Sequence, residues 1–241
     1  MTALQKTISA ERIKLRRSPV WLAFFGLPLI SAFFGTNNYR MNQGILKSEW
    51  LSLWTQHSLF LCFFFMPALI GTYCSYLWRL EHSRNNWNSF LTAPVSHFAL
   101  YFGKLFQGVL MTILGNAWVF LLYFVCGKLC GLTTPVPKAA LSWFLCGTLG
   151  GIVVCCIQLT LSMWIRSFAI PIGIALAGGI GGLLITNKGL GCFYPYSLYP
   201  IGMRANNPNM ELPAGQFLSG CVVYILICCA VSVWKLKRGE G

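Results

Sequence analysis

The chain has 241 residues, of which 56% are hydrophobic and only 10% are charged. Soluble domains carry roughly a quarter charged residues, and a soluble fold of this length cannot hide so much apolar surface. The composition therefore excludes a soluble globular protein, and its high hydrophobicity also excludes a disordered one. The sequence contains no Asp, which excludes aspartyl intramembrane proteases and Ser-His-Asp hydrolases.

The net charge of +13 comes from 18 Lys and Arg against five acids. In a soluble protein, such a balance would indicate nucleic-acid binding. In a membrane protein, it is typical of cations that face anionic lipid headgroups. We therefore predict contact with membrane lipid and no nucleic-acid partner.

Residues 1–17 predict an amphipathic helix that lies on the inner membrane surface. Met1, Leu4, Ile8 and Leu15 fall roughly along one helix face, and basic residues surround them. Such a helix buries its apolar face at the headgroup boundary. Pro19 then opens the first membrane span. The alternative is an unstructured basic tail.

Six apolar stretches follow, each close to the length of about 20 residues that a helix needs to cross a bilayer core. Their continuous apolar runs lack the alternation of a barrel strand, so we predict an all-α membrane protein. The pieces between them are too short for a soluble domain, so residues 1–241 form one transmembrane domain. The predicted spans are 18–36, 57–77, 105–127, 141–164, 168–186 and 216–234.

The distribution of Lys and Arg predicts the orientation of these spans. With the N-terminus inside, the inner pieces contain twelve Lys and Arg and the outer pieces contain six. Because cytoplasmic loops carry the excess of positive charge, both termini are predicted to be cytoplasmic.

Small residues in two spans predict close helix packing. Gly147 and Gly151 have the Gly-x-x-x-Gly spacing, and the run from Gly178 to Gly182 contains four glycines. Such residues let helix backbones approach closely in lipid. The alternative for the second group is a gating hinge.

The longest piece between spans, 187–215, contains four prolines together with Tyr194, Tyr196 and Tyr199. This composition predicts irregular structure or short helices at the outer interface, with the tyrosine rings at headgroup level. The segment dips into the membrane only if other helices cover its backbone.

No Asp, Glu, Lys or Arg lies inside the six predicted spans. Proton and ion pathways are built from buried ionisable residues, so this absence argues against a proton-coupled transporter or pump. The polar residues Asn116 and Gln158 are predicted to form hydrogen bonds between helices, with substrate contact as the alternative.

The sequence also lacks the motifs of common membrane enzymes. It has no P-loop and no His-Glu-x-x-His, and its three His do not have metal-ligand spacing. We predict no catalytic residue and no metal site in this chain. If ATP and Mg are needed, another chain binds them.

The loop between the second and third spans is the most informative polar segment. It mixes charge with Trp87, Phe90 and Leu91 and then reaches Pro94. We predict a short amphipathic helix over 81–94 that ends before this proline. A cytoplasmic helix with an exposed aromatic face needs a protein partner or the membrane surface.

At this loop the chain resembles the type-2 ABC exporter permeases. The matching features are Glu81 after the second span, Leu91, the turn at Pro94-Val95, and Gly103-Lys104 at the opening of the third span. The layout of an amphipathic start and six spans also matches. Other stretches resemble the lantibiotic-immunity permeases of the epidermin, mutacin and nisin type, namely 14–19, 50–56, 78–82 with 86–88, and 166–173.

The resemblance implies a permease that pairs with an identical or related permease chain and docks on a dimer of ATPase subunits. The loop helix would be the coupling helix, and the implied substrate is an amphipathic, cationic antimicrobial peptide expelled from the bacterial cell membrane. The implied coupling residues are Glu81, His82, Arg84, Trp87, Phe90, Leu91 and Pro94.

Two other functions remain open at this point. The first is an ABC-2 permease for another amphiphile, such as bacitracin, a drug or a lipid. The second is a membrane sensor or assembly partner without transport activity. Two of the implied coupling residues also have an alternative role. Glu81 could be a solvated acid near Arg84, and Trp87 could be an interfacial anchor.

Overall fold

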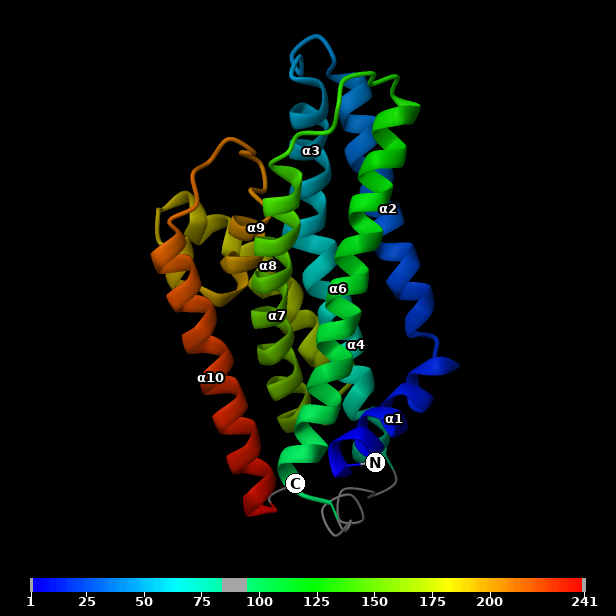
Figure 1. Ribbon diagram of the computed structural model, residues 1–241, viewed down its shortest axis with the longest axis vertical. Coiled ribbons are helices and arrows are strands. Elements are labelled where there is room, and N and C mark those ends of the chain that lie inside the picture. Colours follow the sequence, from blue (N-terminus) through cyan, green and yellow to red (C-terminus); the bar gives the residue numbers. More distant parts are fainter. Residues whose placement is uncertain (1, 84–94, 240–241) are drawn as a thin grey trace.

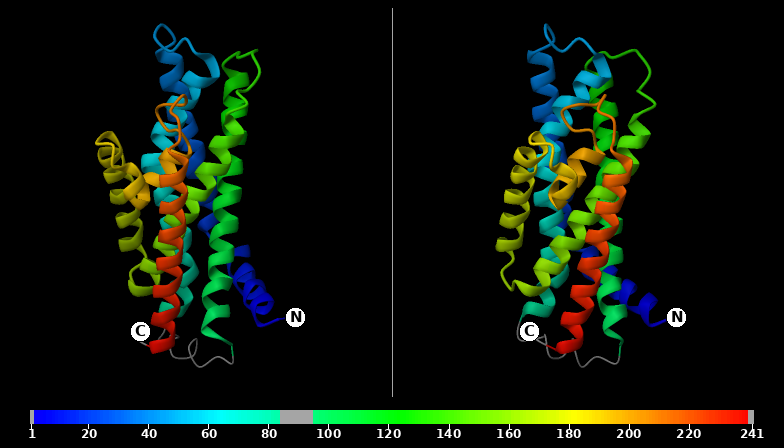
Figure 2. Two further views of the ribbon diagram at one scale, coloured as in Figure 1. Left: turned by 60° about the vertical axis from the view of Figure 1, so that its left-hand side comes forward. Right: turned by 90° about the vertical axis from the view of Figure 1, so that its left-hand side faces the viewer.

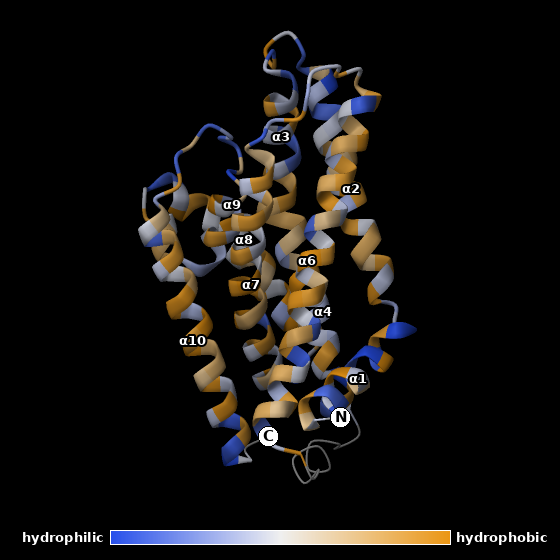
Figure 3. Cartoon of the chain, viewed as in Figure 1, coloured by the Kyte–Doolittle hydropathy of each residue, from blue (hydrophilic) through white to orange (hydrophobic). Residues whose placement is uncertain are grey.

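Six long helices form one bundle in the computed structural model, which describes residues 2–83 and 95–239. Each is long and apolar enough to cross a membrane, and no strand occurs in the described ranges, so the all-α membrane fold is confirmed. Figure 3 shows apolar residues along the middle of the bundle. The six are α2 (Val20–Met41), the continuous run α3–η1–α4 (Glu49–Phe60, Leu61–Phe65, Met66–His82), α6 (His97–Leu129), α7 (Ala140–Trp164), α8 (Ala169–Asn187) and α10 (Ala214–Arg238).

Helix α1 (Ala3–Arg16) and the last turn of α10 lie at the same end of the bundle (Figure 1), as six crossings require. The last turn of α10 carries Lys235, Lys237 and Arg238, and the last turn of α1 carries Lys14 and Arg16. We call this end the basic end and the opposite one the far end. The positive-inside rule predicts that the basic end faces the cytoplasm.

The second and third long helices extend well past the predicted spans. Helix α4 continues to His82, and α6 begins at His97 because the Ser96 hydroxyl accepts a hydrogen bond from the Ala99 N–H at 3.2 Å. Glu81 and Lys104, which lie outside the predicted spans, are therefore parts of the helical bundle. A hydropathy pattern marks the apolar middle of such helices and misses their polar ends.

The amphipathic N-terminal segment forms the predicted helix. A capping box starts α1, in which Thr2 and Gln5 each bind the other's backbone N–H. The helix packs on the first turns of α6, where the Thr7 hydroxyl donates to the Ala99 carbonyl at 3.0 Å and the Gln107 amide donates to the Ile8 carbonyl at 3.2 Å. Protein contacts thus fix α1 at the basic end.

The segment between α8 and α10 folds into the bundle. Its three short helices are η3 (Gly191–Phe193), η4 (Pro195–Ser197) and α9 (Leu198–Gly202), and they lie beside the far-end halves of α7, α8 and α10 (Figure 2). We call residues 191–203 the inserted segment. Tyr196 and Tyr199 are buried against other helices and Tyr194 is half-buried, while the depth of these rings in the membrane stays a prediction. The hydroxyls of Tyr196 and Tyr199 find polar partners inside the bundle, described below.

The four glycines predicted to pack helices make room for this inserted segment. Added Cβ atoms would collide with it or touch it, because its backbone and side chains lie directly against α7 and α8. Gly151 also contacts α6, through the Thr112 side chain. The contacts pair Gly147 with Met203, Gly151 with Tyr199, Gly178 with Tyr196, and Gly182 with Ser197.

We expect Gly150→Ala to destabilise the bundle, because its methyl group would clash with the α9 backbone at Leu198. Overpacking of this kind costs about 1–3 kcal/mol. Gly173→Ala on α8 is the matched control, since no heavy atom lies within 4 Å of its added Cβ. Thermal unfolding in detergent should show a lower apparent Tm for Gly150→Ala alone. Equal Tm values for both variants would contradict the close approach of α9 to α7.

Candidate functional site

Four charged side chains meet at the basic end, where α1, α4 and α6 come together. Lys104 on α6 is fully buried, and its Nζ donates to Glu81 Oε1 at 2.8 Å and to Glu11 Oε1 at 3.0 Å. Lys14 Nζ lies 2.6 Å from each of the same two carboxylate oxygens. We call these four residues the ion cluster. It joins the N-terminal helix to the ends of two membrane-spanning helices.

The ion cluster is electrically balanced, with two carboxylates against two ammonium groups. Lys104 also donates to the Leu77 carbonyl at 2.6 Å, and its Nζ lies 4.8 Å from the centroid of the Trp78 ring. A buried charge is very costly without such partners. Removing any one member of the ion cluster therefore leaves an uncompensated charge inside the protein.

Lys14 remains charged over the whole neutral range. Burial acts to lower its pKa, but the carboxylates of Glu11 and Glu81 outweigh this effect and raise the pKa above the ordinary value of 10.5. Because the folded state holds this proton more tightly, the stabilisation from Lys14 is complete below the unfolded pKa. It is lost only as the pH rises through the raised, folded pKa.

Two of the predicted coupling residues are described, and both are held by other helices. Glu81 is only 4% exposed and points into the ion cluster, so the alternative of a solvated acid is wrong. His82 Nε2 lies 2.8 Å from the Ser162 carbonyl oxygen, which can only accept, so this nitrogen carries a proton and donates. The end of α4 is thereby bonded to the end of α7. The other predicted coupling residues, Arg84, Trp87, Phe90, Leu91 and Pro94, lie outside the described residues.

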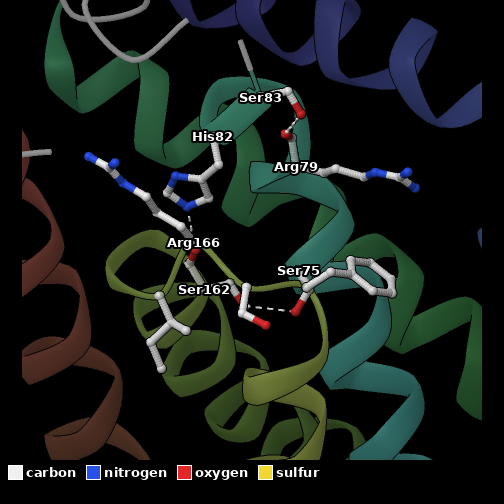
Figure 4. Close-up of a pocket in the computed structure, with 9 residues that line it drawn as sticks. Ser75, Arg79, His82, Ser83, Ser162 and Arg166 are labelled. Atoms are coloured by element: carbon white, nitrogen blue, oxygen red, sulfur yellow. Dashed lines mark hydrogen bonds between the residues drawn. The ribbon is translucent and has the colours of Figure 1, made fainter. Parts of the chain in front are cut away.

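A cavity of about 210 Å³ opens beside His82, between the end of α4 and the turn that joins α7 to α8. Figure 4 shows Ser75 and Ser162 joined by a hydrogen bond across it, and the side chains of Arg79 and Arg166 leaving on opposite sides. We call this cavity the basic pocket. Its lining offers serine hydroxyl groups and contains no acid, while the guanidinium groups of Arg79 and Arg166 point away from it. The lining residues are Ser75, Arg79, His82, Ser83, Ser162, Ile165, Arg166, Ser167 and Phe168.

Asn116 and Gln158, the predicted polar residues of the spans, are both fully buried. The Asn116 amide donates to the Thr148 hydroxyl at 3.0 Å, which confirms a hydrogen bond between α6 and α7. Asn116 Oδ1 also accepts from the Tyr199 hydroxyl at 2.9 Å, and Gln158 donates to the Tyr196 hydroxyl at 2.7 Å. Both residues therefore anchor the inserted segment, while a contact with substrate stays a prediction.

Sequence reasoning missed three members of the ion cluster, Glu11, Lys14 and Lys104, as site residues. A signal was present in the acid count, because the chain has only five acids against 18 Lys and Arg. One of them, Glu11, stands alone in a strongly basic segment. An acid in such a place is expected to neutralise a specific cation rather than to serve solubility.

A comparison with protein families matches residues 7–182 to the family described as "ABC-2 family transporter protein". The matched range runs from α1 through most of α8 and contains the ion cluster and every residue of the basic pocket. A comparison with curated proteins finds no match.

We expect Lys104→Met to release α1 from the bundle, because two buried carboxylates would then share only Lys14. Breaking a buried ion pair on one side costs about 3–5 kcal/mol. Thermal unfolding in detergent and trypsin cleavage within α1 measure the effect. Lys6→Met is the control, since Lys6 is an exposed lysine of the same helix. Equal stability and cleavage of the two variants would contradict the role of the ion cluster.

A double variant tests whether charge balance is the cause. Glu81→Gln alone leaves one positive charge in excess, whereas Glu81→Gln with Lys104→Met leaves the neutral pair of Glu11 and Lys14. We therefore expect the double variant to lose less stability than the sum of the two single losses. Strictly additive losses in apparent unfolding free energy would show that the charges do not interact.

Proposed function

This chain belongs to the ABC-2 transporter family and is therefore a multi-pass permease subunit of an ABC transporter. We propose that it exports an amphipathic, cationic antimicrobial peptide. The family match, which covers residues 7–182, carries the permease role. The peptide class rests on the stretches that resemble lantibiotic-immunity permeases. The substrate lies in the outer leaflet of a bacterial plasma membrane and is expelled to the exterior, which protects the cell.

The energy for export comes from an ABC ATPase, the partner that the family implies. In this proposal a dimer of ATPase subunits binds ATP and Mg and docks at the basic end. A second permease chain, identical or related, completes the membrane part. The segment 81–94 acts as the coupling helix that follows the closing of the ATPase dimer.

The contacts of Glu81 and His82 support this coupling role. Glu81 is bonded to Lys104 of α6 and Lys14 of α1, and His82 is bonded to the end of α7. A displacement of the following segment therefore acts on three other helices through short polar contacts. The membrane domain needs no ionisable pathway of its own, because the driving force arrives at the basic end.

The basic pocket extends this docking surface. It lies beside the start of the coupling segment, and Arg79 and His82 line it together with serine hydroxyls. An acidic side chain of the ATPase would find serine hydroxyls as hydrogen-bond donors in this pocket and no acid that repels it, with Arg79 and Arg166 at its edges. The pocket would then hold the ATPase against both α4 and the α7–α8 turn.

The decisive experiment purifies the tagged chain in mild detergent and identifies the proteins that accompany it. Recovery of a P-loop ATPase, together with ATP-dependent protection of cells from a cationic lantibiotic, supports the proposal. Recovery of the ATPase with protection only from bacitracin or another amphiphile would overturn the peptide class. Absence of any ATPase at normal expression would favour a sensor or assembly partner.

We expect Trp87→Ala to lower ATPase recovery and peptide resistance without changing the apparent Tm of the chain. Loss of an aromatic anchor at an interface costs about 2 kcal/mol, or roughly thirtyfold in affinity. Phe193→Ala, an exposed aromatic residue at the far end, is the control and should keep both properties. Glu81→Ala should lower resistance and Tm together, because it also breaks the ion cluster. Full resistance in Trp87→Ala would contradict the coupling helix.

A further inference from the structure

An open apolar groove lies between the ends of α7 and α10 that point to the basic end. It has a volume of about 510 Å³ and is lined by Trp164, Ala230, Val231 and Trp234. All four lining residues are exposed, and the residues Trp164 and Trp234 are 49% and 46% exposed. No described part of the chain covers this groove, which lies on the surface of two membrane-spanning helices.

Two cations stand at the groove, each stacked on one of its tryptophans. Lys235 Nζ lies 4.5 Å from the centroid of the Trp164 ring, and Arg238 Cζ lies 4.2 Å from that of Trp234. Such cation–π contacts hold the two charged groups near the rings and cost them little of their contact with water. Neither α7 nor α10 contains an acid that could neutralise them.

We propose that this groove binds one anionic phospholipid of the leaflet at the basic end. An acyl chain fills the apolar part between the two tryptophans, and Lys235 and Arg238 bind the phosphate. Tryptophan, lysine and arginine side chains at a helix end are suited to headgroup depth. Basic sites between membrane helices on the cytoplasmic side are suited to anionic headgroups. Such a lipid site needs only the membrane-spanning fold and does not depend on which substrate is transported.

The charges argue against a second copy of the chain as the occupant. Two parallel copies related by a twofold axis along the membrane normal place the same residues opposite each other. Packing through this groove would bring Lys235, Lys237 and Arg238 of both copies together without an acid on either helix. An ATPase is also a poor occupant, because the groove is apolar and belongs to the membrane-spanning part of α10.

Arg166 adds a third cation near the same end of α7. It follows Trp164 by two residues, and in Figure 4 its side chain extends toward the side on which α10 lies. A phospholipid in the groove would therefore lie next to the α7–α8 turn that forms one wall of the basic pocket. The lipid would steady this turn against α10.

The test measures the apparent Tm of the purified full-length chain in detergent during titration with dioleoylphosphatidylglycerol. We expect a saturable rise that dioleoylphosphatidylcholine does not reproduce, and no rise with inorganic phosphate alone. Equal rises with both lipids would overturn the headgroup site. A full rise with inorganic phosphate would show a free-anion site instead and would overturn the lipid.

Variants with matched controls separate the two parts of the site. Lys235→Gln with Arg238→Gln should weaken the phosphatidylglycerol effect at least tenfold in midpoint concentration, whereas Lys237→Gln, an exposed lysine of the same turn, should not. Ala230→Phe fills the groove and should also weaken the effect, whereas Leu226→Phe, on another exposed position of α10, should not.

Two outcomes of the variant series would overturn the proposal. Equal weakening by Lys237→Gln would show a general attraction between the basic end and anionic lipid rather than a site. A chain that runs as a dimer in detergent and dissociates with Ala230→Phe would show that a second copy covers the groove. Loss of ATPase docking changes neither readout, so the test stands apart from the proposed function.

Discussion

A buried lysine ammonium group constrains the whole basic end of this bundle. Lys104 has no access to solvent, so its charge must be neutralised by groups that the fold brings to it. The two carboxylates come from two other helices, Glu11 from the N-terminal helix and Glu81 from the end of α4. Buried ion pairs add little net stability compared with apolar packing, but they admit few alternative arrangements. The positions of α1 and of the end of α4 therefore depend on this contact.

Hydropathy was sufficient to predict the number of long helices and the position of their apolar middles, because a helix that crosses lipid needs a continuous apolar run. It was insufficient for their ends, since Glu81 and Lys104 look like loop residues in any averaged window. The glycines were predicted to pack one span against another, but it is mainly the inserted segment that lies against them, and a missing side chain does not reveal what fills the space. The burial of Tyr196 and Tyr199 depends on Gln158 and Asn116 of other helices, and no local pattern joins these residues.

The candidate site was also predicted only in part from the sequence. The loop motif led to Glu81 and His82, and both lie at the basic end. Their actual contacts, with α1, α6 and α7, come from residues distant in sequence and follow from three-dimensional packing. The coupling role of the segment beyond His82 is a proposal that depends on the family and on ATPase docking. The contacts that join Glu81 and His82 to the bundle are hydrogen bonds.

Helix α7 makes contacts at both ends of the bundle. Its Ser162 carbonyl is bonded to the end of α4, and about 22 Å away along the helix, at 1.5 Å per residue, Gly147 faces Met203 of the inserted segment. Because both ends of α7 are held in this way, a displacement of the end of α4 would reach the inserted segment through a single helix.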